Sequence, residues 1–424
     1  MSEPTTFEIG RTKITIYGGL NTIGGNCVVI RSPTQSVMLD QGVNFLQLKS
    51  FYGLSIQPES VEELRDMGVL PPREAYDDIE EVYISHLHLD HLGSLNFPNE
   101  EISVYLPSRE VAEVLSHSWW FGWKQQLLPQ TLSFAGFEDV KESKSLKFTN
   151  VSHSAYPSYA FRIDTDDVSL IYTGDFRVKS LRFRDSLSNL SILAEDGVDI
   201  AIIEGTNFGR RMNYLTPNQF EALFDELFEN YRQKILFFTA HPLDFEATLS
   251  VIELLWKHSY VPVFENPYYA QILDVMIEIS NYTVENDLIF TPMRTSGIKT
   301  YENFEIEYLS NLKDMKLAFF IPISGIKDME TILRLLDLLG ENILHVTIIG
   351  ESIEEEWIIE ERKLENWLSL LGITSYRIHL SGHYHPYEFV EIIDAIKPKK
   401  IIPIHTMQPE TMLNLFQKFS QKFS

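Results

Sequence analysis

The stretch "SHLHLDHLGS", residues 85–94, brings three histidines and one aspartate together within a few positions. An apolar, strand-like segment leads straight into it, so the stretch is expected to begin in an extended conformation. Side chains of an extended segment alternate between two faces, and His86 and His88 therefore point the same way while the leucine between them points to the core. Two imidazoles held in this way indicate one side of a metal site.

The second half of the stretch supplies donors for a second ion. Asp90 and His91 follow at once, and Gly93 permits a turn that would aim them at a neighbouring point. Two ions about 3.5–4 Å apart are used by hydrolases that clamp both the attacking and the leaving oxygen. The alternative is a surface loop that is histidine-rich by chance, which would rarely place four donors in this register. Imidazole and carboxylate donors fit zinc best, with manganese as the second choice.

Three further donors lie at the ends of apolar, strand-like segments. They are His153 in "NVSHSAYP", Asp175 in "YTGDFR" and His405 in "IPIHT". Loops at strand ends are where layered α/β proteins gather functional groups. A single histidine in such a place is more often a hydrogen-bonded structural residue. Together with the cluster, however, these three complete a set of seven donors.

Composition sets limits on location and on the way a substrate is held. The chain has 424 residues, which suits two domains or one domain with a large insertion. Its net charge of −25 has the wrong sign for holding nucleic acid by long-range attraction, so an anionic substrate needs metal ions, clustered cations or helix N-termini. The single Cys27 excludes an internal disulfide framework. With no long apolar run and no signal-like N-terminus, a cytoplasmic protein without membrane association is expected.

The pattern of expected strands and helices changes along the chain. Strand-like segments separated by glycines fill residues 13–43, and similar segments recur up to residue 206. From about residue 216, helices and strands alternate, beginning with a helix that Thr216 and Pro217 would open. This alternation predicts βα units on a mostly parallel sheet.

The motifs and their order resemble a known family. "HLHLDH", with Asp40 upstream in "VMLDQG" and with His153 and Asp175 downstream, is similar to the metallo-β-lactamase fold. Glu204 in "AIIEGT", His383 in "LSGHYHP" and His405 match the further motifs of the β-CASP nucleases. Among these, "YGGLNTIGGN", "LQLKSFYGLSIQP", "DMGVLPP" and "TGDFR" look most like ribonuclease J in its short archaeal form.

The resemblance implies an α/β fold made of two parts. Residues 1–208 and 372–424 would form a metallo-β-lactamase αββα sandwich. Residues 209–371 would form the inserted β-CASP domain, an α/β domain on a parallel sheet.

The resemblance also implies a role for each donor. His86, His88 and His153 would hold one divalent ion, Asp90, His91 and His405 would hold the other, and Asp175 would bridge them. A hydroxide between the ions would attack the phosphodiester, with Asp90 in the catalytic centre. His383 would stabilise or protonate the leaving oxygen, and Glu204 would orient His383. Asp40 would fix the loop of the first two histidines or, alternatively, cap a turn at a strand end.

A pocket for the 5′ phosphate of RNA is less clearly marked. In ribonuclease J a polar loop after a β-CASP strand is commonly followed by an arginine, whereas "ILFFTAHPLDFEATL" contains none. Thr239, Ser324, Ser381 and Gly382 are the groups expected to donate hydrogen bonds to a phosphate.

The expected activity is that of a metal-dependent ribonuclease that degrades single-stranded RNA from 5′ to 3′ and prefers a 5′ monophosphate. An endoribonuclease and a catalytically silent RNA-binding scaffold are the alternatives. A protein that kept the nuclease fold but lost its activity would be expected to have lost metal donors, and this chain keeps them. A small-molecule hydrolase of the same fold would not need the insertion or the set of Glu204, His383 and His405. RNA is the expected substrate, and a homodimer and partners in an RNA-degradation complex are further expectations.

Overall fold

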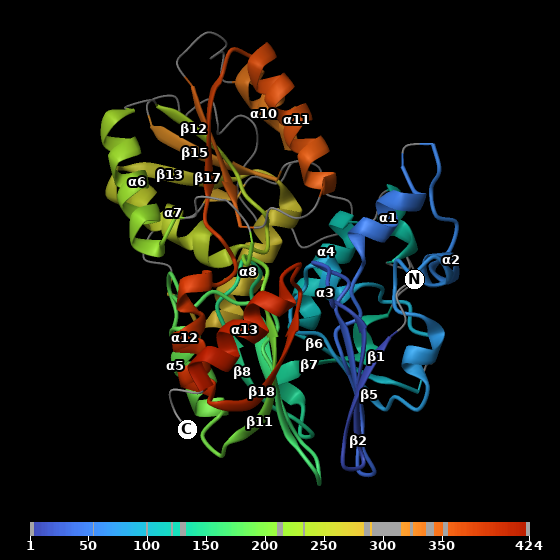
Figure 1. The fold of residues 1–424 in the computed structure, drawn as a ribbon. Coiled ribbons are helices and arrows are strands. Elements are labelled where there is room, and N and C mark those ends of the chain that lie inside the picture. The colour runs from blue at the N-terminus through green and yellow to red at the C-terminus, as the bar shows by residue number, and fades with distance from the viewer. Residues whose placement is uncertain are drawn as a thin grey trace. The chain divides into compact units, whose positions relative to one another are not determined.

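Both ends of the chain build one unit of the fold, and the middle builds another. The structure, a computed structural model, describes residues 4–420 except 54, 99–100, 120–121, 128–132, 210–214, 232–233, 284–288, 291–314, 323–324, 336–342 and 351–354. The first unit comprises residues 1–211 and 382–424, and the second comprises residues 212–381 (Figure 1).

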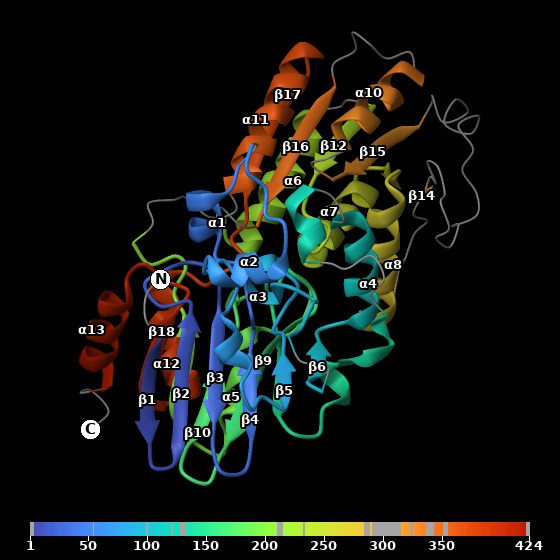
Figure 2. The ribbon, with the colours of Figure 1, turned by 90° about the vertical axis from the view of Figure 1, so that its right-hand side faces the viewer.

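The first sheet of the first unit has seven strands in sequence order. They are β1 (Thr5–Ile9), β2 (Thr12–Gly18), β3 (Cys27–Arg31), β4 (Ser36–Leu39), β5 (Glu81–Tyr83), β6 (Ser103–Leu106) and β7 (Phe137–Asp139). Strands β1 to β4 pair antiparallel, and β4 to β7 pair in parallel. Figure 2 shows β1 to β6 side by side. Because β4 and β5 are parallel neighbours, the loops that follow them meet at one edge of the sheet.

Helices and a second sheet complete this unit. The connections after β4, β5 and β6 carry α1 (Phe45–Phe51), α2 (Val61–Asp66), α3 (Leu89–Leu92) and α4 (Arg109–Trp119). The second sheet has the order β18 (Pro398–Ile404), β11 (Val198–Glu204), β10 (Ser169–Tyr172), β9 (Ser158–Asp164) and β8 (Lys147–Val151). Strand β18 pairs in parallel with β11 and sets Ile404 opposite Glu204. The C-terminal segment therefore completes the second sheet.

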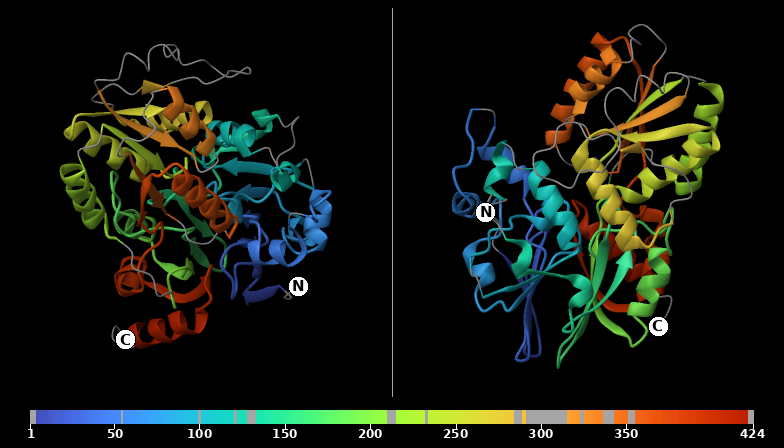
Figure 3. Two further views of the ribbon diagram at one scale, coloured as in Figure 1. Left: turned by 90° about the horizontal axis from the view of Figure 1, so that it is seen from above. Right: turned by 180° about the vertical axis from the view of Figure 1, so that it is seen from behind.

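The two sheets enclose a common apolar core. Ile14 and Val28 from the first sheet pack in one cluster with Phe161 and Ile202 from the second. The alternate residues of the second sheet, such as Ile203, face the other way and pack against α5 (Ser186–Leu193), α12 (Phe389–Ile396) and α13 (Pro409–Ser420). The predicted αββα sandwich is confirmed, and Figure 3 shows its layers from above and from behind.

The second unit is built on a six-stranded sheet in which the described pairings are all parallel, as predicted. Its order is β14 (Ile289–Phe290), β13 (Tyr260–Phe264), β15 (Lys316–Ile321), β12 (Ile235–Thr239), β16 (Leu344–Ile349) and β17 (Thr374–His379). Its helices are α6 (Pro217–Asn230), α7 (Phe245–Lys257), α8 (Pro267–Ser280), α10 (Ile326–Leu335) and α11 (Glu355–Leu370).

Helices cover both faces of this parallel sheet. Residues of α10 and α11 pack with Phe237 and Phe319. On the other face, Phe224 and Phe228 of α6 contact Phe238. As predicted, α6 opens with Pro217 in its first turn and with the Thr216 side chain accepting a hydrogen bond from the backbone N of Gln219.

The boundary expected after residue 371 lies too early. Strand β17 pairs in parallel with β16 along its whole length, and the second unit extends to Ser381. Four of the six residues of β17 are exposed because it is an edge strand. It therefore lacks the apolar signature by which the buried strands were recognised.

Candidate metal centre

The histidine cluster is buried and spans the loop after β5 and the short helix α3. His88 is the N-cap residue of α3, and Gly93 ends that helix with a φ of 63°, which is the turn that the sequence predicted. His86, His88, Asp90 and His91 are each less than a tenth exposed, and Leu87 lies in the core. A solvated, histidine-rich surface loop is thereby excluded.

Two glycines let this loop lie directly against the loop that follows β4. A Cβ atom on Gly42 would lie 1.6 Å from the carbonyl oxygen of Asp90, and one on Gly93 would lie 1.8 Å from the carbonyl oxygen of Gln41. Backbone hydrogen bonds join the two loops, including one of 2.9 Å from Gln41 N to His91 O. The donors are therefore carried on a closely packed pair of loops.

The Asp40 carboxylate lies beneath the cluster and orients it. Asp40 is fully buried and has a φ of 58°, a left-handed conformation that aspartate tolerates. Its Oδ1 accepts from Ser85 N at 2.6 Å, and its Oδ2 accepts from Ser85 Oγ at 2.8 Å. Nδ1 of His91 lies 2.7 Å from Oδ2, and the Tyr172 hydroxyl also donates to Oδ2. The expectation that Asp40 fixes the loop agrees with these contacts, and the contact at Nδ1 turns Nε2 of His91 into the cluster.

The three more distant donors arrive from the second sheet. His153 follows β8, Asp175 follows β10 and His405 follows β18. Nδ1 of His153 donates to the carbonyl oxygen of Gly382 at 2.8 Å, which leaves Nε2 3.2 Å from Nδ1 of His88. Nδ1 of His405 is 2.6 Å from the Thr206 hydroxyl. Each imidazole thus has one nitrogen anchored and the other in the cluster.

The structure brings all seven predicted donors together, in overlapping groups. Donor atoms of His86, His88 and His153 lie within 4.8 Å of one another, as do those of Asp90, His91 and His405, and those of His86, His91 and Asp175. Asp175 Oδ2 lies 3.0 Å from His91 Nε2 and 3.6 Å from His405 Nε2. These groups match the two sets implied by the resemblance, with Asp175 beside both.

The cluster contains both a neutral imidazole and an ionised carboxylate. Burial, reinforced by the neighbouring histidines, lowers the pKa of His86 well below its ordinary value, so its imidazole is neutral and can coordinate. Burial alone would raise the pKa of Asp175, but His405 and His91 outweigh it and keep that carboxyl ionised. Nε2 of His86 and Oδ1 of Asp175 are buried without a hydrogen-bond partner. Donor atoms left unsatisfied in this way fit bound divalent metal.

His383 and Glu204 form a second pair beside the cluster. Nδ1 of His383 lies 3.2 Å from Oε1 of Glu204 and 3.9 Å from Oδ2 of Asp175. The other carboxylate oxygen of Glu204 accepts from Thr206 N at 2.8 Å. The rings of His383 and His153 have centroids 5.1 Å apart. The predicted orienting contact between Glu204 and His383 is therefore present in the structure.

The residues expected to hold a 5′ phosphate are placed differently. Thr239 is buried in the second unit, and its hydroxyl is 2.9 Å from Nε2 of His345. Ser381 is also buried, and Gly382 supports His153 through its carbonyl oxygen. Ser324 lies outside the described residues. The structure thus argues against Thr239 as a phosphate ligand and gives Gly382 an orienting role.

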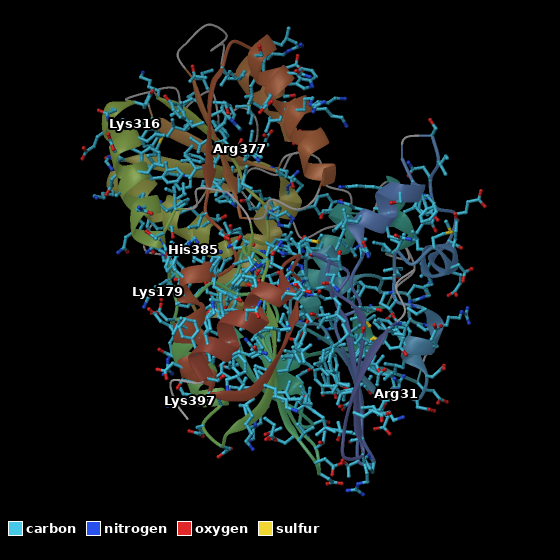
Figure 4. The ribbon with its side chains drawn as sticks, viewed as in Figure 1. Arg31, Lys179, Lys316, Arg377, His385 and Lys397 are labelled. Carbon is cyan, nitrogen blue, oxygen red and sulfur yellow. The ribbon has the colours of Figure 1, made fainter. Side chains whose placement is uncertain are left out.

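Two lysines of the first unit are each paired with a carboxylate. Lys179 lies 2.7 Å from Asp185, and Lys399 lies 2.7 Å from Asp199. Figure 4 labels Lys179 and Lys397 among the side chains of the first unit. Because these pairs are largely exposed, they are worth little energetically, but they place a carboxylate beside each of the two lysines.

Sequence reasoning missed the groups that hold the donors. Ser85, Tyr172 and Thr206 touch Asp40, His405 or Glu204 through their hydroxyls or backbone. Each directly neighbours a motif, but a hydroxyl next to a motif has no pattern that distinguishes it from an ordinary polar residue. Only contacts between distant parts of the chain reveal these roles.

The packing of the two loops can be tested with Gly42→Ala. We expect a loss of about 3 kcal/mol or more in the free energy of unfolding, because an added methyl group would overlap the Asp90 carbonyl. Denaturant unfolding measures the change. Gly136→Ala is the matched control, since its Cβ would meet no atom within 4 Å. Equal stability of the two variants would contradict the described packing.

The chain is similar to ribonucleases J along nearly its whole length. It is 22% identical over 417 residues to "Ribonuclease J" of Helicobacter pylori (strain ATCC 700392 / 26695), covering 93% of this chain and 56% of that protein. It is 21% identical over 423 residues to "Ribonuclease J" of Pyrococcus abyssi, covering 94% of this chain and 90% of that protein. The chain thus spans about half the length of the Helicobacter protein. No family model matches the chain.

A solved structure shares the fold. A protein of unknown function from Enterococcus faecalis V583 aligns with a TM-score of 0.69 at 19% identity, over 96% of this chain and 95% of that one. In the part of the chain that the structure describes, every helix is too short or too polar to cross a membrane. The resemblance to ribonuclease J found in the motifs is thereby confirmed, and the chain is similar to ribonucleases J over nearly its whole length.

Proposed function

We propose that the chain is a metal-dependent ribonuclease that hydrolyses single-stranded RNA at the seven-donor cluster. The observation that carries this proposal is the placement of the buried donor groups directly beside the His383–Glu204 pair. The ribonucleases J are similar to the chain over 93% and 94% of its length. A cluster of donors alone would suit a structural metal site, whereas a neighbouring histidine held by a carboxylate suits proton transfer.

Two divalent ions are proposed as the cofactors. His86, His88 and His153 would hold one, Asp90, His91 and His405 would hold the other, and Asp175 would contact both. Bound ions would polarise the phosphate and lower the pKa of water near them. Zinc is the first choice because the donors are imidazole and carboxylate, and manganese is the second.

His383 is proposed as the group that handles the proton of the leaving oxygen. The Glu204 carboxylate accepts at Nδ1, so the proton that His383 would transfer is carried on Nε2. Glu204 is itself held by Thr206 N and lies on the regular strand β11. A histidine fixed by a buried carboxylate on a strand keeps one tautomer and one orientation, as acid catalysis requires.

The direction of degradation and the preference for a 5′ monophosphate are proposed from the family resemblance. The net charge of −25 supports a substrate held by short-range contacts with ions and site residues. A cytoplasmic location, a homodimer and partners in an RNA-degradation complex are proposed on the same basis. Internal cleavage by an endonuclease is the second candidate. A silent scaffold is disfavoured, because all seven donors are present and are gathered in the structure.

Metal content gives the first test of this proposal. We expect about two divalent ions per chain, most of them zinc, and loss of RNA cleavage on chelation, because six of the donors form two separate groups of three. His86→Ala should lose metal because it removes a donor from the group that it forms with His88 and His153. Elemental analysis of active protein provides the measurement. One ion or none in fully active protein would contradict the two-ion site.

The role of His383 can be separated from metal binding. His383→Ala should keep its metal and slow cleavage by roughly 10²- to 10⁴-fold, the usual worth of a positioned acid or base. Asp90→Asn should lose metal as well as activity. His117→Ala is the control, since His117 is exposed on α4 and bonds to Glu113 of the same helix. Metal loss in His383→Ala equal to that in Asp90→Asn would make His383 a ligand.

The exonuclease assignment is tested with three matched RNAs that carry a 5′ monophosphate, a 5′ hydroxyl or a 5′ triphosphate. We expect the first to be degraded fastest and the last slowest, and a 5′-paired stem to resist. A 5′ label should pass directly to mononucleotide. Long 5′-labelled fragments, or ready cutting of circular RNA, would show instead that the protein is an endonuclease.

A further inference from the structure

A pair of stacked rings follows His383 in the chain. The His385 and Tyr387 rings are nearly parallel, with an interplanar angle of 7° and centroids 5.2 Å apart. Tyr387 is 70% exposed, the second-highest exposure among the large hydrophobic residues that the structure describes. Figure 4 labels His385 among the side chains of the first unit. One face of the tyrosine ring is thus supported, and most of its surface is open to solvent.

The position of this pair is fixed by the surrounding backbone and core. Tyr384, between the two histidines, is buried, and its hydroxyl donates to the carbonyl oxygen of Glu204 at 2.6 Å. The following 3₁₀ turn, Pro386–Glu388, is closed by Glu388, whose carboxylate accepts from His385 N at 2.7 Å. The rings therefore project from a segment that is attached on both sides, and little conformational entropy remains to be lost on binding.

The pair also lies close to the proposed catalytic histidine. His383 and His385 are two residues apart, so their Cα atoms are separated by no more than about 7 Å. The Cα atom of Tyr387 lies within about 14 Å of the Cα atom of His383 by the same limit. Nδ1 of His383 faces Glu204, which in turn accepts from Thr206 next to the donor cluster. The two rings therefore lie within a short distance of the place where a substrate would react at His383.

The charges near the rings favour an uncharged ligand surface. Burial first, and then the Glu388 and Glu391 carboxylates, raise the pKa of Tyr387, so acidic groups lie in its neighbourhood. The nearby Lys179 is already bound to Asp185. A phosphate would meet net negative charge here, whereas the face of a nucleobase carries none.

We propose that the Tyr387 ring, supported by His385, is a stacking platform for one nucleobase of single-stranded RNA beside the scissile phosphate. This inference rests on the proposed ribonuclease function and adds a base-binding site to it. Stacking on an aromatic ring tolerates any base, because every base has a π face. The platform would therefore position the substrate without selecting its sequence.

The test pairs substitutions of Tyr387 with removal of single bases from the RNA. The substrates are 5′-monophosphorylated oligonucleotides in which each position in turn lacks its base, and kcat/KM is measured for the first cleavage. With the wild-type protein, one position near the cleavage site should lose roughly 5- to 100-fold when its base is absent. With Tyr387→Ala, the intact RNA should show a similar loss, mainly in KM, and removal of that base should have almost no further effect.

Further variants distinguish a loss of base stacking from a loss of apolar contact area and from a loss of folded structure. Tyr387→Phe and Tyr387→Trp should keep the wild-type dependence on that base, and Tyr387→Leu should behave as Tyr387→Ala does. Ile192→Ala, which removes a 50% exposed side chain from α5, is the control and should match the wild-type protein. A thermal melt of each variant should coincide with that of the wild-type protein.

Several outcomes would overturn the platform. Tyr387→Ala with wild-type kcat/KM, or with an equal loss on every RNA and an unchanged dependence on the missing base, would show that no base stacks there. A change in oligomeric state without a change in that dependence would assign the rings to a protein contact. If the wild-type protein cleaves RNA but shows no such coupling, only the platform fails. If it cleaves no RNA with zinc or manganese, the proposed function fails.

Discussion

The buried Asp40 carboxylate is the contact on which the candidate site depends. Its two oxygens accept hydrogen bonds from Ser85 and from the Tyr172 hydroxyl and contact Nδ1 of His91. These partners come from the loop after β5 and from the end of β10, so a single carboxylate joins the two sheets of the first unit. A buried carboxylate is tolerated only when it is fully hydrogen-bonded. The need to satisfy this charge therefore holds the donor loop in one position.

The same arrangement leaves other groups unsatisfied within the protein alone. Nε2 of His86 and Oδ1 of Asp175 are buried without a hydrogen-bond partner, and such atoms cost about 1–3 kcal/mol each. Metal binding would remove this cost, so the fold and the bound ions are expected to stabilise one another. Asp40 holds the donor loop in place, and the cluster supplies donor atoms that can coordinate an ion. A site built in this way is organised before a substrate arrives.

Much of this site could be predicted from sequence because its donors lie in short motifs at strand ends. His86 to His91 share one connection after β5, and His153, Asp175 and His405 each closely follow the end of a strand. The orientation of these donors could not be predicted, because it depends on contacts between distant residues, such as that of His153 with Gly382. The environment of Thr239 could not be predicted either, since its partner His345 lies on the neighbouring strand β16. The edge strand β17 escaped recognition because its exposed residues carry no apolar period.

The central claim is that the protein binds two ions side by side and that His383 is not a ligand of either. Anomalous diffraction at the zinc edge, from crystals grown with zinc, tests this claim most directly. Two peaks are expected, one bounded by His86, His88 and His153 and the other by Asp90, His91 and His405, with Asp175 in contact with both. A single peak, or a peak coordinated by Asp175, Glu204 and His383, which form a further group of donors within 4.8 Å of one another, would contradict it.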